Sequence, residues 1–219
     1  MGVWHATMAT CLAFYCIFFA CGPGQNFFNS DECADNPRNI TIFVAMFSGG
    51  YFFVDLILLV VYTHCQTVMQ KQYLMHHLIG WLLLTLPLIT HDYFTSASVA
   101  YMIVEVSGAF PSIRWLMFQH GFTNTNSLMT LNSMLLAFTF LFGRMPLLMV
   151  LIFKSTLWEW LSVFTGEPRG WLYILFVVFC GITFCLILLL NFYWAYAMVK
   201  MVTKVLKGGS MPAEGAETA

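Results

Sequence analysis

The chain has 219 residues, of which 60% are hydrophobic, 17% aromatic and only 9% charged, and its formal net charge at pH 7 is −1. A soluble domain carries about 25% charged residues, so this composition excludes an ordinary water-soluble globular protein. The small net charge gives no indication of a nucleic-acid partner. With a mean hydropathy of +0.78, the chain is expected to have a lipid bilayer as its main solvent.

Six apolar runs follow one another along the chain, separated by short polar segments. Only helices and closed barrels satisfy their backbone hydrogen bonds in lipid, and these runs are far longer than the strands of about ten residues that barrels use. We therefore predict an all-α polytopic membrane protein with a six-transmembrane-helix bundle. The predicted spans are Val3–Cys21, Thr41–Thr63, Leu74–Thr90, Thr95–Ile113, Ser127–Phe153 and Trp171–Val199.

The loop after the first span has two features of its own. Cys21 and Cys33 bracket it and are able to pair on an oxidising side of the membrane; the alternative is that they remain small buried hydrophobic residues, like the other cysteines. Asn39-Ile40-Thr41 is a glycosylation sequon. We expect it to stay unmodified, because it lies directly against the second span.

The basic residues predict the orientation, and the last residues form a separate segment. Cytoplasmic loops carry an excess of Lys and Arg. Successive loops lie on alternate sides of the membrane, which puts five of these basic residues on the side of the termini and three on the other side. Both termini are therefore predicted inside. We predict a transmembrane domain over residues 1–207 and a polar tail over residues 208–219. The two sets are Lys71, Arg114, Lys200, Lys204 and Lys207, against Arg38, Lys154 and Arg169.

Ionisable side chains inside the predicted spans are few, and each one is informative. A charged residue at the bilayer centre costs about 2.5–3.5 kcal/mol on insertion scales and commonly marks a functional site. Four-residue spacing on a helix puts two side chains on one face, which relates Tyr51 to Asp55 and Tyr101 to Glu105. The candidate site residues are Tyr51, Asp55, His76, His77, Glu105, Asn132 and Arg144.

Three interpretations of this polar set remain open. In the first, Arg144 pairs with Glu105 or Asp55 and holds the bundle together; in the second, the set lines a cavity for a lipid; in the third, it carries protons or ions. His76 and His77 are about 100° apart on a helix, so we expect at most one to point into the interior. The pattern indicates no metal site and no cofactor.

Five short motifs resemble those of the TLC domain, the fold shared by ceramide synthases, TRAM proteins and smaller relatives. Each motif is weak alone, but their order and spacing are similar to those of the family from about residue 4 to residue 203. The resemblance implies a six-helix TLC-type bundle. The motifs are Gly50-Tyr51 with Asp55, Met75-His76-His77-Leu78, Glu105-Val106-Ser107 with Phe110 and Arg114-Trp115, Asn132 with Phe142-Gly143-Arg144, and Asn191 with Trp194; Trp4-His5-Ala6 resembles the opening of the first core helix.

The chain departs from the ceramide synthases at one position. Those enzymes carry a His-Asp pair in the helix after the paired histidines, where this chain has Val104-Glu105. The dipeptide His91-Asp92 comes too early to replace it. An acyl transfer needs a correctly positioned base, so the resemblance favours the smaller relatives, which are linked to membrane lipid handling.

The function therefore has three candidates. The first is a lipid-binding or lipid-handling protein with membrane lipids as partners, and we lean against an enzyme. The second is an accessory structural subunit of a large membrane complex, for example in the mitochondrial inner membrane. The third is a ceramide-synthase-like acyltransferase, in which His76 or His77 acts as base with help from Glu105. The family resemblance implies the endoplasmic reticulum as the compartment.

Overall fold

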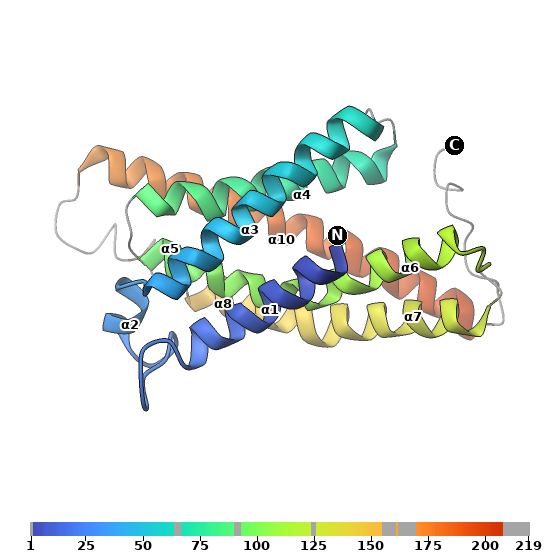
Figure 1. Cartoon of the computed structure of the whole chain (residues 1–219), viewed down its shortest axis with the longest axis horizontal. Coiled ribbons are helices and arrows are strands. Elements are labelled where there is room, and N and C mark those ends of the chain that lie inside the picture. The colour runs from blue at the N-terminus through green and yellow to red at the C-terminus, as the bar shows by residue number, and fades with distance from the viewer. Residues whose placement is uncertain are drawn as a thin grey trace.

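The computed structural model describes residues 2–63, 67–89, 93–123, 126–154, 161 and 170–207, and every regular element in these ranges is helical (Figure 1). Several elements continue one another directly, so that one membrane segment contains up to three helical stretches. The elements are α1 (Gly2–Phe18), α2 (Asp31–Asp35), α3 (Asn39–Leu58), η1 (Leu59–Thr63), α4 (Val68–Thr85), η2 (Leu86–Ile89), α5 (Tyr93–Tyr101), η3 (Met102–Gly108), α6 (Ala109–Gln119), α7 (Ser127–Phe138), η4 (Thr139–Arg144), α8 (Met145–Ile152) and α10 (Trp171–Leu206).

Within the described residues, five helical segments are long and apolar enough to cross a membrane. The remaining predicted span, the first along the chain, corresponds to α1, which has 17 residues, the lower end of the length that a bilayer requires. The prediction of an all-α polytopic bundle is therefore confirmed. The five segments are Asn39–Tyr62, Gln70–Ile89, Tyr93–Gln119, Ser127–Ile152 and Tyr173–Lys204.

Two segments end later than the sequence predicts. The fourth continues to Gln119 instead of Ile113, and the last continues to Lys204 instead of Val199. In both cases the helix continues past the first basic residue, Arg114 or Lys200. Long basic side chains keep their apolar stems in the membrane and extend their charge to its surface, so a helix does not have to end where they begin.

The fourth segment, α5–η3–α6, is the centre of the bundle. Its apolar stretch is 56% buried, against 28–39% for the other four long segments. Its first helix, α5, packs against α1, α2, α3, α4 and α8. Residues on this segment are therefore surrounded by protein on most sides, which makes it the place where a polar side chain is best shielded from lipid.

Helices α3 and α4 approach each other closely through small residues. A side chain added at Gly49 of α3 would meet the methyl group of Thr85 at 3.0 Å, and one at Gly80 of α4 would meet the ring of Phe52 at 3.3 Å. Small residues are typical of such contacts, because they let two membrane helices pack with their backbones near each other. This packing fixes α3 and α4 as one unit.

Two membrane segments depart from α-helical geometry near their middle. The fourth contains the 3-10 stretch η3, and the fifth contains the π-helical stretch η4, which ends directly before Met145 and Pro146. Proline lacks the N–H that an α-helix needs at this point, and a wider π turn accommodates the loss. The fifth segment thus meets Pro146 with a π turn directly before it.

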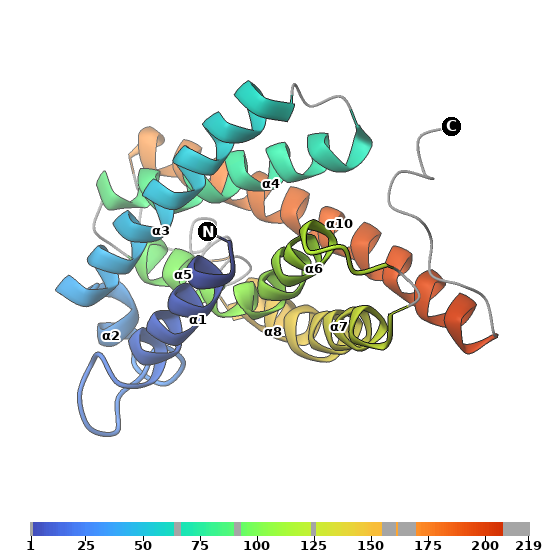
Figure 2. The ribbon, with the colours of Figure 1, turned by 45° about the vertical axis from the view of Figure 1, so that its right-hand side comes forward.

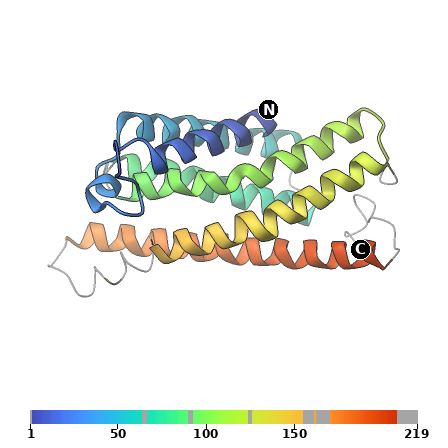
Figure 3. The ribbon, with the colours of Figure 1, turned by 90° about the horizontal axis from the view of Figure 1, so that it is seen from below.

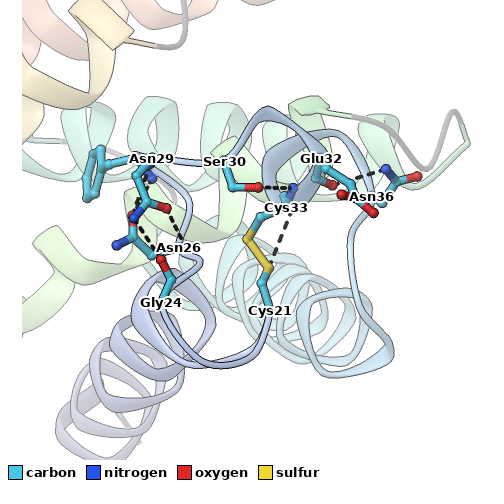
Figure 4. Close-up of a disulfide and its surroundings, with 9 residues drawn as sticks. Cys21, Gly24, Asn26, Asn29, Ser30, Glu32, Cys33 and Asn36 are labelled. Carbon is cyan, nitrogen blue, oxygen red and sulfur yellow. Dashed lines mark hydrogen bonds between the residues drawn. A yellow bond between two sulfur atoms is a disulfide. The ribbon is translucent and has the colours of Figure 1, made fainter.

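The loop between α1 and α3 is closed by a disulfide bond (Figure 4). Cys21 and Cys33 are bonded, with their Cα atoms 5.7 Å apart, so the pairing that the sequence left open is present. Ser30 caps the short helix α2 by accepting a hydrogen bond from the Cys33 N–H. Gly22 has φ = 101°, a left-handed conformation that glycine adopts without strain.

The disulfide loop lies at the opposite end of the bundle from the C-terminal end of α10 (Figure 1). Lys154, which follows α8, donates a hydrogen bond of 3.1 Å from its ammonium group to the carbonyl of Phe28. The loop is therefore held against the ends of the membrane segments on its side of the bundle. In Figure 3, α7 and α8 run alongside α10, while α1 stops short of the end that α6 and α7 reach.

Candidate functional site

A cluster of polar side chains lies inside the bundle, contributed by five of its membrane segments and by α1. On α3 and α4 it is about two helical turns from the end that faces the side of the C-terminus. We call it the polar cluster. Its members are His5 on α1, Tyr51 and Asp55 on α3, His76 and His77 on α4, Glu105 and Ser107 on η3, Arg144 on η4, and Asn191 on α10.

Arg144 is the most connected member of the polar cluster. Its Nη2 lies 3.5 Å from Oε1 of Glu105, its Nε donates to Asn191 Oδ1 at 2.7 Å, and its Nη1 donates to the hydroxyl of Ser107 at 3.2 Å and to the carbonyl of Val104 at 3.3 Å. Its side chain is only 5% exposed. A buried charge requires this degree of pairing to be tolerated.

The two carboxylates each meet one histidine. Nε2 of His76 lies 3.7 Å from Oε1 of Glu105, and Nδ1 of His77 lies 2.8 Å from Oδ2 of Asp55. Both are ion pairs when the imidazole is protonated. The His77 contact is close in distance, but Nδ1 makes no hydrogen bond with the described residues.

Both histidines of α4 are buried, although we expected at most one to point into the interior. His76 is 8% exposed and His77 is 9% exposed. Helix α4 is covered on two sides, by α3 and by α10. Two side chains about 100° apart can therefore both face protein. Trp194 of α10 contributes to this cover, with its ring 5.6 Å from that of His76.

His5 belongs to the cluster but was not among the predicted site residues. Its ring stacks on Tyr51 with a centroid distance of 3.6 Å and an interplanar angle of 7°, and the residue is 5% exposed. The Tyr51 ring in turn lies 6.4 Å from that of His77. An ionisable side chain near the end of an apolar helix costs less in lipid than one at the bilayer centre, so the sequence carries only a weak signal for His5.

Asn132 is the one predicted site residue that the structure places elsewhere. Its side-chain amide donates a hydrogen bond of 3.0 Å to the carbonyl of Phe110, which joins α7 to α6. Nearby, Nη1 of Arg114 donates to the hydroxyl of Ser133 at 2.6 Å. These two bonds form a second link between the same helices, separate from the polar cluster.

Unsatisfied nitrogen atoms remain inside the cluster. His5 Nε2 and His76 Nδ1 are buried and have no hydrogen-bond partner among the described residues. Such atoms are rare in folded proteins, because each loses its hydration without compensation. Among the described residues, no three His, Cys, Asp or Glu side chains lie close enough together to hold a metal ion.

A family model described as the TLC domain (TRAM_LAG1_CLN8) matches residues 2–200. The chain belongs to the TLC domain family. No curated protein and no solved structure matches the chain. The match covers α1, the first four long membrane segments and the last one up to residue 200, so the entire polar cluster lies within the TLC domain.

Residues of different TLC-like motifs contact one another in the structure. Glu105 and Ser107 of one motif hold Arg144 of the next, and Asn191 of the last motif accepts a hydrogen bond from the same guanidinium. The paired histidines meet the two carboxylates. Residues that look scattered along the sequence are therefore the contact points of one buried polar network.

The position that distinguishes this chain from ceramide synthases is part of this network. Where those enzymes are expected to carry a His-Asp pair, the carbonyl of Val104 and the carboxylate of Glu105 both contact Arg144. His91 and Asp92 lie outside the described residues. Glu105 is thus engaged in an ion pair with Arg144 at this position.

Proposed function

We propose that this TLC-domain membrane protein handles lipids, and that its polar cluster binds the polar group of a lipid. One observation carries the proposal: His5 Nε2 and His76 Nδ1 are buried in the membrane part of the protein with no hydrogen-bond partner among the described residues. A bound hydroxyl or amine group would supply the missing bonds. A lipid is the ligand that reaches such a depth from the bilayer.

The charges of the cluster support a polar ligand. Asp55 and Glu105 carry two negative charges against the single positive charge of Arg144, which is already fully engaged with protein atoms. A ligand with hydrogen-bond donors fits this environment better than an apolar chain does.

We also propose that the protein resides in the endoplasmic reticulum, with the disulfide loop in the lumen. The bond between Cys21 and Cys33 requires an oxidising compartment on that side, and the lysines of α10 at the opposite end favour the cytosolic side. Co-fractionation with markers of the mitochondrial inner membrane would contradict this assignment. We do not extend the proposal to acyl transfer, since Glu105 is held by Arg144.

The test of lipid binding compares three variants that each remove one polar side chain from a membrane segment. Wild-type protein and the variants His5→Leu, His77→Leu and Asn132→Leu are purified in a mild detergent, and bound lipids are quantified by mass spectrometry. We expect the wild type and Asn132→Leu to retain the same lipid species, because Asn132 lies outside the cluster. The variants His5→Leu and His77→Leu should lose most of the bound lipid.

Equal lipid retention by all four proteins would contradict the proposal and leave the cluster with a structural role alone. Elution volume in size-exclusion chromatography and the melting temperature identify variants that fail to fold. If a histidine variant does not fold, Tyr51→Phe takes its place, since it removes only the hydroxyl group and keeps the ring that stacks on His5.

A further inference from the structure

The C-terminal end of α10 carries a row of lysines beyond the membrane core. The helix has 36 residues and is therefore about 54 Å long at 1.5 Å per residue, whereas the hydrocarbon layer is about 30 Å thick. Lys200 and Lys204 lie in its last turns, Lys207 directly follows it, and all three are exposed. Figure 2 shows these turns standing clear of the other helices.

These lysines share one face of the helix with an aromatic and an aliphatic residue. Positions three and four apart lie above one another on a helix, which aligns the whole set. Together its members form one continuous exposed face at the end of the helix. We call this set the lysine face of α10. Its members are Tyr196, Val199, Lys200, Thr203, Lys204 and Lys207.

The charge of the lysine face is not compensated within the described part of the chain. None of its lysines forms an ion pair with a described residue, since the described acidic residues lie in the disulfide loop or in the polar cluster. Three positive charges therefore face outward side by side. Such a row attracts an anion, and at a membrane surface the most abundant anions are lipid headgroups.

The same face continues into the membrane as an apolar strip. Exposed apolar side chains occupy positions aligned with the lysines by the 3.6-residue period, and Tyr196 marks the transition between the two parts. Tyrosine is typical of this interfacial level. The strip provides a surface for acyl chains directly below the charges, which a free anion would not need. It consists of Ile182, Leu186, Leu189, Phe192 and Tyr196, which are 43–68% exposed.

We propose that the lysine face of α10 binds the headgroup phosphate of an anionic phospholipid, in the leaflet on the side of the C-terminus. The ammonium groups of Lys200, Lys204 and Lys207 would contact the phosphate and its acidic substituent, with their stems along the helix. The acyl chains would follow the apolar strip below Tyr196. This site is separate from the polar cluster and does not depend on it.

The test measures binding of phosphatidylserine and phosphatidylcholine to the full-length protein by native mass spectrometry. The variant Lys204→Gln is compared with Lys71→Gln, a matched change of one exposed lysine on the same side but on α4. Lys204→Gln should weaken phosphatidylserine binding about five-fold, in line with the contribution of one lysine near an anionic surface. Lys71→Gln should leave it unchanged.

Replacing all three lysines by glutamine should abolish the preference for phosphatidylserine, while replacing all three by arginine should preserve it. The arginine variant also shows that a loss is not caused by misfolding. A preference that survives the glutamine variant, or an equal loss in Lys71→Gln, would overturn the proposal. Displacement of phosphatidylserine by inorganic phosphate at similar concentration would also overturn it, because the site would then recognise a free ion.

Discussion

Arg144 and Glu105 form a buried ion pair between two membrane segments, with Nη2 of Arg144 3.5 Å from Oε1 of Glu105. Both residues lie in turns that depart from α-helical geometry, Glu105 in the 3-10 stretch η3 and Arg144 in the π-helical stretch η4. The same guanidinium reaches α10 through Asn191. One side chain thus connects three segments at the centre of the bundle.

Removing Arg144 should be strongly destabilising. Arg144→Met leaves Glu105 as a buried charge without its main partner, and breaking a pair of this kind costs about 3–5 kcal/mol. The double variant Arg144→Met with Glu105→Gln should cost clearly less than the sum of the two single changes, because both charges are gone. Thermal unfolding in a mild detergent measures all three. Strictly additive losses would show that the two side chains do not interact.

Asp55 should matter less for stability than Glu105. The Asp55 side chain is 32% exposed and that of Glu105 is 11% exposed, and partly exposed ion pairs contribute about 1 kcal/mol or less. We expect Asp55→Asn to lower the melting temperature only slightly, and Glu105→Gln to lower it substantially. A larger fall in melting temperature for Asp55→Asn than for Glu105→Gln would contradict the burial of the Arg144–Glu105 pair.

Two neighbouring glycines of α3 should respond differently to the same substitution. A side chain at Gly49 would press on Thr85 and Leu84 of α4, whereas one at Gly50 meets nothing within 4 Å. Gly49→Val should destabilise the protein by about 1–3 kcal/mol, the usual cost of overpacking, and Gly50→Val should have little effect. Equal melting temperatures for the two variants would show that α3 and α4 are not packed as described.

Loss of the disulfide should destabilise the loop between α1 and α3. Cys21→Ser removes a bond that closes a loop of twelve residues, and such a cross-link contributes about 2–4 kcal/mol. Cys185→Ser is the control, because Cys185 is a free and exposed cysteine of α10. The melting temperature of the wild type, but not of Cys21→Ser, should also fall when a reducing agent is added. A wild type insensitive to reduction would contradict this prediction.

The sequon at Asn39 should remain unglycosylated. Asn39 is the first residue of α3 and therefore lies where the chain enters the membrane, too close for a bulky oligosaccharide to be attached. Treatment with an endoglycosidase should leave the electrophoretic mobility of the protein unchanged. A variant with a new sequon at Gln25, Gln25→Asn with Phe27→Thr, tests whether the loop enters the lumen; a shift on treatment would place it there.

The sequence predicts the architecture well, because a membrane demands long apolar helices and leaves few alternatives. It also identifies most members of the polar cluster, since ionisable residues in apolar spans are rare. Side-chain directions are harder to predict. Tyr101 and Glu105 were expected on one face, but the 3-10 turn that begins at Met102 rotates them about 120° apart. Tyr101 instead stacks on Phe184 of α10 at 4.5 Å.

Two further features were beyond the reach of sequence patterns. The pairing of Cys21 with Cys33 depends on the turn geometry of the loop between them, which spacing alone does not determine. His5 was overlooked because it lies at the edge of its apolar run, where a polar residue is usually taken as a flank. In the structure the packing of α1 against α3 and η3 buries this edge and brings His5 onto Tyr51.

The most direct measurement of lipid binding is native mass spectrometry of the wild-type protein, extracted gently from its own membrane. If the polar cluster is a lipid site, the chain should appear as a small particle that retains one lipid of a defined class after the detergent has been removed. A bare chain, or a chain found only within a large complex and carrying no lipid, would contradict the account and favour a purely structural role for the cluster.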